Sequence, residues 1–235
     1  MNKILVIFLI LLAPALADAQ TGSIPSVDLV WEARTYTPPD YQGRCLVTPE
    51  SLVRVVALTE TKNLTFYWRK DGTEIKSASG ASRDVFTYRA GNTIGSSNLI
   101  EMVATQTDGA VAARAAARIP VGAPKIVFYE VKDGQINYRR ALKNFNLMTD
   151  QAKIVAEPFY FSTPDWLNRR LSFNWMANGQ KIAAATEDPR FLTLITKADT
   201  AGETMLDLKI TNSEHLFQTA AVKLSVNFGQ TSFGF

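Results

Sequence analysis

The same pattern of twelve residues occurs twice in the chain, and it limits the fold more than any other feature. The copies run from Leu64 to Ile75 and from Leu171 to Ile182, with leucine, phenylalanine, tryptophan, glycine and isoleucine at the same offsets. In each copy the large apolar residues occupy every second position, and an Asp-Gly or Asn-Gly dipeptide follows the tryptophan. Alternation of this kind, ending in such a dipeptide, predicts a half-buried β-strand that runs into a tight hairpin turn.

Two copies of the pattern imply two similar β-domains in tandem. Trp68 and Trp175 stand 107 residues apart, which is about the length of one small domain. We expect a first domain over residues 28–119, a linker over 120–124 and a second domain over 125–228. The linker contains two prolines, so it should restrict the angle between the domains. Both tryptophans share the phase of the neighbouring leucine and phenylalanine, which places them in the cores rather than on ligand-binding surfaces.

Further strands are expected where apolar residues alternate between turn signals. They cover residues 28–33, 51–58, 84–88, 99–105, 125–130, 152–161, 191–195, 205–210 and 220–228, while 144–150 should be irregular and 229–235 should form a flexible tail. The segment Ala110–Ile119 carries two conflicting signals, since alanine is the best helix former. Its odd-numbered positions are apolar and both of its arginines fall on the other parity. We therefore predict that it is the last strand of the first domain.

The strand around Trp68 or Trp175, with its Asp-Gly or Asn-Gly turn, resembles the third strand of bacterial immunoglobulin-like and PKD-like domains. In those domains the tryptophan packs between two sheets. The resemblance implies an all-β fold of two tandem immunoglobulin-like antiparallel β-sandwiches, without the cysteine pair of antibody domains. The segments Tyr36–Pro39 and Thr48–Ser51 also look like those of uncharacterised exported proteins of candidate bacterial lineages. This fold hosts many activities, so the resemblance implies no specific one.

The first residues have the order of features typical of an export signal. A lysine precedes an apolar run over residues 4–12, and Ala17 and Ala19 form a small-x-small cleavage site. We expect residues 1–19 to be a signal peptide and the mature protein to be periplasmic, exposed at the cell surface or extracellular. An uncleaved segment that anchors the protein in the membrane is the alternative.

The net charge and the number of cysteines limit which partners and which disulfide bonds are expected. The net charge is +3 and no run of lysine or arginine occurs, so a nucleic-acid partner is not expected. Cys45 is the only cysteine, so an exported chain of this kind has no internal disulfide and depends on its packed cores. For Cys45 a buried, inert thiol is favoured over an intermolecular disulfide.

Residues suited to catalysis or metal binding are scarce. His215 is the only histidine. It is therefore the only histidine that could act as the general base for a catalytic nucleophile, and no pair of histidines is available to bind a metal ion. We expect it to be a solvated loop histidine between two strands. Asp71, Asp84 and Asp108 fall in different loops and are interpreted as turn formers rather than calcium ligands. With no phosphate-binding loop either, the sequence predicts no catalytic residue, no cofactor and no metal, and the chain is interpreted as a non-enzyme.

One loop is a candidate protein-contact site, because Tyr36, Pro38, Pro39 and Tyr41 combine aromatic area with a stiff backbone. We therefore expect a non-enzymatic exported structural or protein-interaction module, with a protein partner in a cell-envelope assembly such as a pilus or secretion apparatus. The alternative is a periplasmic pilus-type chaperone, a family that also has two immunoglobulin-like domains. The sequence identifies neither that family's basic cleft pair nor its strand of large alternating apolar residues.

Overall fold

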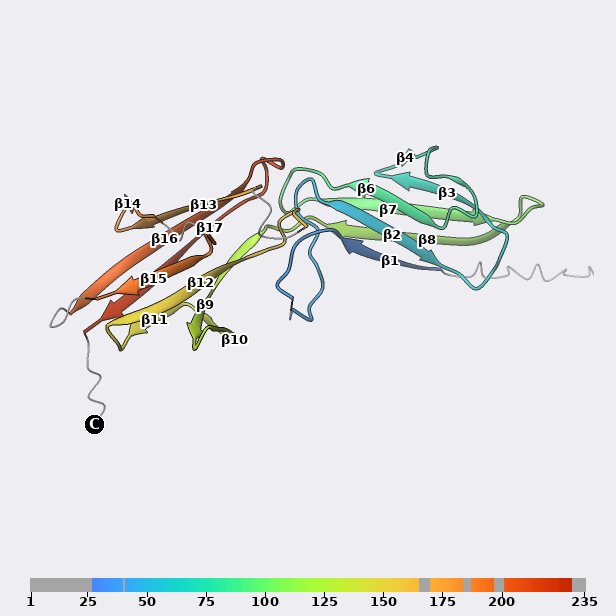
Figure 1. The fold of residues 1–235 in the computed structure, drawn as a ribbon. Coiled ribbons are helices and arrows are strands. Elements are labelled where there is room, and N and C mark those ends of the chain that lie inside the picture. Colours follow the sequence, from blue (N-terminus) through green and yellow to red (C-terminus); the bar gives the residue numbers. More distant parts are fainter. Residues whose placement is uncertain (1–26, 40, 165–169, 184–186, 197–200, 230–235) are drawn as a thin grey trace, which may run out of the picture.

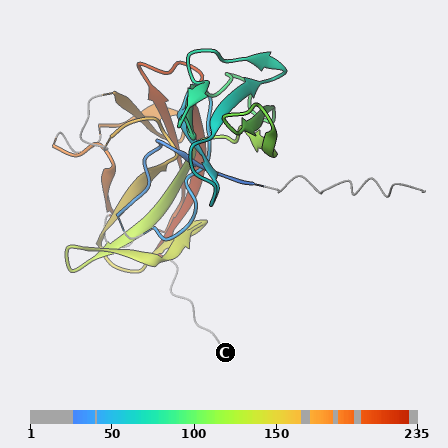
Figure 2. The same cartoon turned by 90° about the vertical axis from the view of Figure 1, so that its right-hand side faces the viewer.

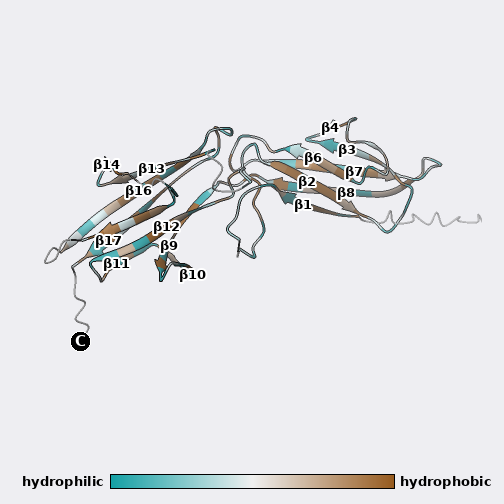
Figure 3. Ribbon diagram, in the orientation of Figure 1, coloured by the Kyte–Doolittle hydropathy of each residue, from teal (hydrophilic) through white to brown (hydrophobic). Residues whose placement is uncertain are grey.

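A computed structural model describes residues 27–39, 41–164, 170–183, 187–196 and 201–229, so the expected signal peptide and residues 230–235 of the expected tail lie outside it. The described residues form strands β1 to β17, which build two β-sandwiches lying end to end (Figure 1). In the view along the long axis, one sandwich stands behind the other (Figure 2). Apolar residues are concentrated on the strands (Figure 3). No helix in the described part of the chain is long and apolar enough to cross a membrane.

The first sandwich contains β1 to β8 and consists of two sheets. One sheet has the order β1 (Asp28–Ala33), β2 (Leu52–Leu58), β6 (Val85–Arg89). The other has the order β4 (Thr73–Glu74), β3 (Thr65–Lys70), β7 (Ser97–Thr105), β8 (Val111–Pro120), and β5 (Gly80–Ala81) also pairs with β3. All of these pairs are antiparallel.

The second sandwich contains β9 to β17 and repeats this arrangement. One sheet has the order β10 (Gln135–Leu142), β9 (Lys125–Lys132), β12 (Gln151–Phe159), β15 (Phe191–Ile195). The other has the order β11 (Asn144–Leu147), β17 (Thr219–Phe228), β16 (Gly202–Asn212), β13 (Leu171–Ala177), β14 (Gln180–Lys181).

Both sandwiches share one core topology. The strand with the duplicated motif, β3 or β13, pairs with the next-to-last strand, which pairs with the last strand. The facing sheets have the equivalent orders β1-β2-β6 and β9-β12-β15. This is the arrangement of an immunoglobulin-like sandwich, in which the tryptophan of the third strand packs between the sheets. The predicted all-β fold of two tandem immunoglobulin-like sandwiches is confirmed.

Each sandwich closes around its own tryptophan, as predicted. Trp68 and Trp175 are 0% and 1% exposed. Their indole N–H groups donate hydrogen bonds of 2.9 Å to the carbonyl oxygens of Arg83 and Pro189. The one polar atom of each buried indole is therefore satisfied, so the ring is buried without an unpaired donor.

Both duplicated strands also end in the predicted tight turn. The φ angles are 49° and 79° at Asp71 and Gly72, and 47° and 80° at Asn178 and Gly179. Two consecutive residues with positive φ define a type I′ turn, which asparagine, aspartate and glycine adopt most readily. The alanine-rich segment is strand β8 as predicted, with Ala113 buried on the inward parity.

The sequence prediction is wrong at several points in the second sandwich. Residues 135–142, where no strand was expected, form β10 beside β9. Residues 144–147 are not irregular but form β11, which pairs in parallel with β17, so the sandwich is not purely antiparallel. Only Phe145 and Leu147 carry the apolar alternation there, which is too short a signal to detect. The strand expected to continue to Phe161 ends at Phe159, because Tyr160 adopts a φ of 66°, in the left-handed region.

Strand β12 is buried on both faces, although its sequence alternates as if one face met solvent. Ile154 and Ala156 lie in the main core of the second sandwich, and Val155 and Glu157 on the opposite face are also 0% exposed. A separate apolar cluster covers this outer face and includes Tyr129, Val155, Phe159 and Tyr160, with Leu46 of the first sandwich packed against it. The outer face of β12 is thus part of the junction between the sandwiches.

Candidate functional site

The loop that connects β1 to β2, residues 34–51, reaches across to the second sandwich; we call it the docking loop. The backbone N–H of Tyr36 donates to the carbonyl of Phe161 at 2.7 Å, and the N–H of Tyr160 donates to the carbonyl of Tyr36 at 2.7 Å. These two hydrogen bonds tie the backbone of Tyr36 to two adjacent residues that follow β12, and so join the two sandwiches. The left-handed conformation of Tyr160 is part of the turn that ends β12 beside the docking loop.

The structure places the four predicted contact residues in the docking loop. The hydroxyl of Tyr36 donates to Glu157 Oε2 at 3.5 Å, and the hydroxyls of Tyr41 and Tyr160 lie 2.7 Å apart. Pro38 is buried and Pro39 is exposed. The aromatic residues of the loop therefore bind the second sandwich of their own chain, and contact with another protein through these residues stays a prediction.

A buried amide completes the junction. Gln218, immediately before β17, is 0% exposed. Its Nε2 donates to the carbonyl of Pro49 at 2.6 Å and to Ser162 Oγ at 2.7 Å, and its Oε1 accepts the N–H of Ser162 at 2.7 Å. Beside it, Thr48 Oγ1 donates to the carbonyl of Tyr160 at 2.8 Å. A satisfied buried polar network of this kind fixes one geometry, because any shift leaves a donor or acceptor unpaired.

A buried ion pair lies beside the docking loop. Glu157 accepts two hydrogen bonds from Arg190 Nη1, at 2.9 and 3.1 Å, and one from the Tyr138 hydroxyl at 3.0 Å. Arg190 also donates from Nη2 to Asp188 at 2.8 Å. Burial acts to lower the pKa of Arg190, but its hydrogen bonds with Asp188 and the nearby carboxylates outweigh this and raise it. The guanidinium therefore stays charged and keeps Glu157 compensated.

The tyrosines of the junction predict a loss of stability in alkali. Burial, and then the charge of Glu157, raise the pKa of Tyr36 from 10.0 to about 12. Burial also raises the pKa of Tyr138 and of Tyr160. Below pH 10 these phenols are protonated in both states. Above it the unfolded chain loses protons that the folded chain retains, so the free energy of unfolding should fall as the pH rises from 10 toward 12.

Urea unfolding at a series of pH values, with tyrosinate absorbance recorded in parallel, measures this effect. In Tyr36→Phe the alkaline fall should be shallower, because one of the titrating groups is removed. A free energy of unfolding that stays constant over this range would contradict the burial of the tyrosines.

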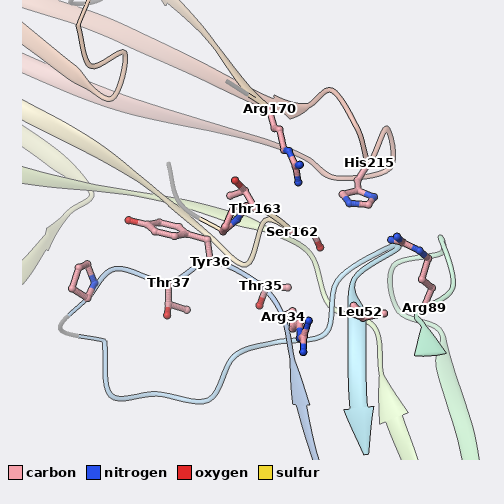
Figure 4. Close-up of a pocket in the computed structure, with 12 residues that line it drawn as sticks. Arg34, Thr35, Tyr36, Thr37, Leu52, Arg89, Ser162, Thr163, Arg170 and His215 are labelled. Carbon is pink, nitrogen blue, oxygen red and sulfur yellow. The ribbon is translucent and has the colours of Figure 1, made fainter. Parts of the chain in front are cut away.

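A cleft of about 800 Å³ opens between the sandwiches along the docking loop. Its basic residues come from both halves, Arg34 and Arg89 from the first and Arg170 and His215 from the second. Figure 4 shows the Arg170 guanidinium, the His215 ring and the Arg89 guanidinium around one opening, with Arg34 on the docking loop. Hydroxyl groups of four residues also line the cleft: Thr35, Thr37, Ser162 and Thr163. The cleft therefore presents hydrogen-bond donors and positive charge.

His215 is not the solvated loop histidine that we expected. It lies between β16 and β17, but its side chain is only 14% exposed, and Nδ1 is 4.0 Å from Glu50 Oε2 of the first sandwich. The expectation failed because the loop faces the docking loop, which the local sequence does not reveal. Cys45, also in the docking loop, is a free thiol of intermediate exposure.

The sequence identified the docking loop but not its counterparts. Gln218, Ser162 and the arginines of the cleft are far apart in the chain, and no spacing connects them. The one available signal was Glu157, which falls in a run of apolar residues on β12. Among the described residues, no cluster of three or more histidine, cysteine, aspartate or glutamate side chains could hold a metal ion.

No protein-family model matches the chain, and no curated protein matches it. The chain is similar to the solved fibronectin(III)-like modules of Clostridium thermocellum CbhA, with 13% identity, a TM-score of 0.28 and coverage of 88% of this chain and 97% of that one. It is also similar to the N-terminal Ig1-2 module of Drosophila receptor protein tyrosine phosphatase DLAR, with 10% identity, a TM-score of 0.27 and coverage of 88% and 100%.

A further similar structure is the Ig1–Ig3 ectodomain of mouse nectin-like molecule 4, with 14% identity, a TM-score of 0.31 and coverage of 88% of this chain and 66% of that one. All three TM-scores are below 0.5. The immunoglobulin-like assignment therefore depends on the strand order and the buried tryptophans, and no activity or partner is transferred from these proteins.

Proposed function

We propose that the chain is an exported, non-enzymatic structural or protein-interaction module, which holds a protein partner or spaces other parts in a cell-envelope assembly such as a pilus or secretion apparatus. The observation that carries the proposal is the junction centred on Gln218. Its side chain bonds Pro49 of one sandwich and Ser162 of the other. Two sandwiches held at a fixed angle can space other components or present a binding surface in a defined orientation. A freely jointed pair could not hold that orientation.

The connection between the sandwiches supports the same function. Only residues 121–124 separate β8 from β9. Val121 is 1% exposed, and the N–H of Gly122 donates to the carbonyl of Val47 in the docking loop at 2.8 Å. This connection is packed into the junction rather than free in solvent, so it adds to the stiffness of the pair.

Export is tested by the N-terminus of the mature protein. The small residues Ala17 and Ala19 predict cleavage before Gln20. Mass spectrometry of the protein recovered from the envelope or medium of its source cells should therefore give a chain that begins at Gln20. Recovery of the uncleaved chain in the cytosol would contradict export, whereas recovery of the uncleaved chain in the membrane would support the anchored alternative.

The interaction itself is tested by capture from envelope extract. The intact chain should retain a reproducible envelope protein, and the double variant Gln218→Ala, Thr48→Ala should retain less of it, because the junction then lacks the buried side-chain hydrogen bonds of Gln218 and Thr48. Gln106→Ala, at an exposed position between β7 and β8, is the matched control and should behave as the intact chain. Failure to retain any envelope protein, or turnover of a small molecule by the purified chain, would overturn the proposal.

The pilus-type chaperone remains the second candidate, because a basic cleft does lie between the sandwiches. That role also requires a strand of large alternating apolar residues in the first sandwich. Strand β8 instead turns Ala113, Ala115 and Ala117 inward. Alanines cannot fill the deep apolar groove of a client subunit, so we favour the module.

A further inference from the structure

The positive charge of the cleft between the sandwiches is only partly used within the protein. None of the described residues that line the cleft is acidic. Arg34 is exposed and makes no side-chain hydrogen bond or ion pair with a described residue. Its guanidinium can therefore donate all of its hydrogen bonds to a ligand.

The other two arginines of the cleft also retain free donors. Arg170 Nε is 2.9 Å from Glu214 Oε1, and Arg89 Nη1 donates to the carbonyl of Glu50 at 3.1 Å. Each of these bonds occupies one of the five N–H groups of a guanidinium. The bonds hold the side chains in place beside the cleft, and the remaining donors can face a ligand. Guanidinium groups fixed in this way suit the bidentate binding of carboxylates.

Two exposed apolar residues follow the cleft residue His215 in the chain. Leu216 and Phe217 follow His215 in the loop between β16 and β17, and they are 80% and 51% exposed. Together they form a small exposed apolar patch in the same loop as His215, and contiguous exposed apolar patches are a feature of interaction sites. A small inorganic anion would use the arginines but not this pair.

We propose that the cleft between the sandwiches binds an extended acidic peptide segment of a protein partner, with its side-chain carboxylates on Arg34, Arg89 and Arg170 and an apolar side chain on Leu216 and Phe217. The inference rests on the proposed function, since it supplies the chemistry by which the module recognises its partner. Charge complementarity favours such a segment, and the apolar pair favours a peptide over a polyanionic glycan.

Fluorescence anisotropy with the full chain tests the site. The probe is a fluorescein-labelled peptide of alternating glutamate and leucine, amidated at its C-terminus so that only side-chain carboxylates are presented. Arg34→Gln should weaken its binding about tenfold, the effect of losing one charge-assisted hydrogen-bonding group. Arg139→Gln, which makes the same change at an exposed position on β10, should leave binding unchanged. Salt near 1 M, where the screening length is about 3 Å, should weaken binding strongly.

Two further arms address the class of ligand. A peptide with glutamine in place of glutamate should bind at least about tenfold more weakly. The double variant Leu216→Ser, Phe217→Ser should weaken binding of the acidic peptide while leaving the thermal unfolding temperature of the protein unchanged. If heparin displaces the peptide and binds more tightly than the peptide does, the site belongs to polyanionic glycans and the proposal is overturned. Equal binding of the glutamine peptide, equal loss in Arg139→Gln, or no binding of the acidic peptide would also overturn it. If envelope capture succeeds while the acidic peptide does not bind, the cleft proposal fails and the module stands.

Discussion

Replacing Trp175 with alanine should lower the free energy of unfolding of the second sandwich by about 3–5 kcal/mol, and Trp68→Ala should do the same in the first. Both indoles are essentially fully buried, and each donates a hydrogen bond across its core. The change removes a large apolar volume and leaves a carbonyl without its donor. Chemical denaturation followed by circular dichroism measures the loss, and hydrogen exchange should localise it to the sandwich that carries the change.

Trp31 provides the matched control. It lies on β1, is only partly buried, and has the guanidinium of Arg44 4.7 Å from its ring centre. Trp31→Ala should cost about 1 kcal/mol, since part of the ring already faces solvent. A negligible loss in Trp68→Ala or Trp175→Ala, or a loss no larger than that of Trp31→Ala, would mean that the cores do not centre on the duplicated tryptophans.

The second large effect is expected at the buried ion pair of the junction. Arg190→Met should lower the free energy of unfolding by about 3–5 kcal/mol, because it leaves Glu157 buried with its charge uncompensated. The Glu157 side chain is 0% exposed and that of Arg190 is 8% exposed. The double variant Glu157→Gln, Arg190→Met should recover part of this loss, because no buried carboxylate then remains.

Arg54→Met is the control for this change. Arg54 forms an ion pair with Glu32 at 3.7 Å, and both side chains are well exposed. Exposed pairs of this kind contribute about 0–1 kcal/mol. Denaturant titrations of the three variants at neutral pH give the comparison, and a loss in Arg190→Met as small as that in Arg54→Met would contradict a buried ion pair at the junction.

The sequence predicts the architecture well where the signal is local. The pattern around Trp68 and Trp175 is repeated, and type I′ turns admit few residue types, so both strands and both turns follow directly from it. The alternation of apolar and charged positions also assigns the alanine-rich segment correctly to a strand. Arg114 and Arg118 must face solvent, and this requirement outweighs the helix propensity of alanine. The main exceptions are β10, which no expected strand covers, and β11, whose four residues give no sign of their long-range parallel pairing with β17.

The site is less predictable because contacts between distant segments create it. Gln218 would be an ordinary exposed glutamine just before a strand if Pro49 and Ser162 did not surround it. Similarly, the sequence of β12 alternates as if one face met solvent, but residues of β9 and β10 and Leu46 of the docking loop, all distant in the sequence, pack against that face. The prolines and aromatic residues of the docking loop are visible in the sequence. The residues that the loop contacts are not, because they depend on the relative position of the two sandwiches.

The central claim is that the docking loop and Gln218 hold the two sandwiches at one fixed angle. Residual dipolar couplings of backbone amides test this most directly, since they report the orientation of each sandwich. The couplings of β1–β8 and of β9–β17 should fit a single alignment tensor with the relative orientation seen in Figure 1. In the double variant Gln218→Ala, Thr48→Ala the two sets should begin to differ. Two unequal tensors in the unmodified chain would show that the sandwiches move independently, and would contradict the account.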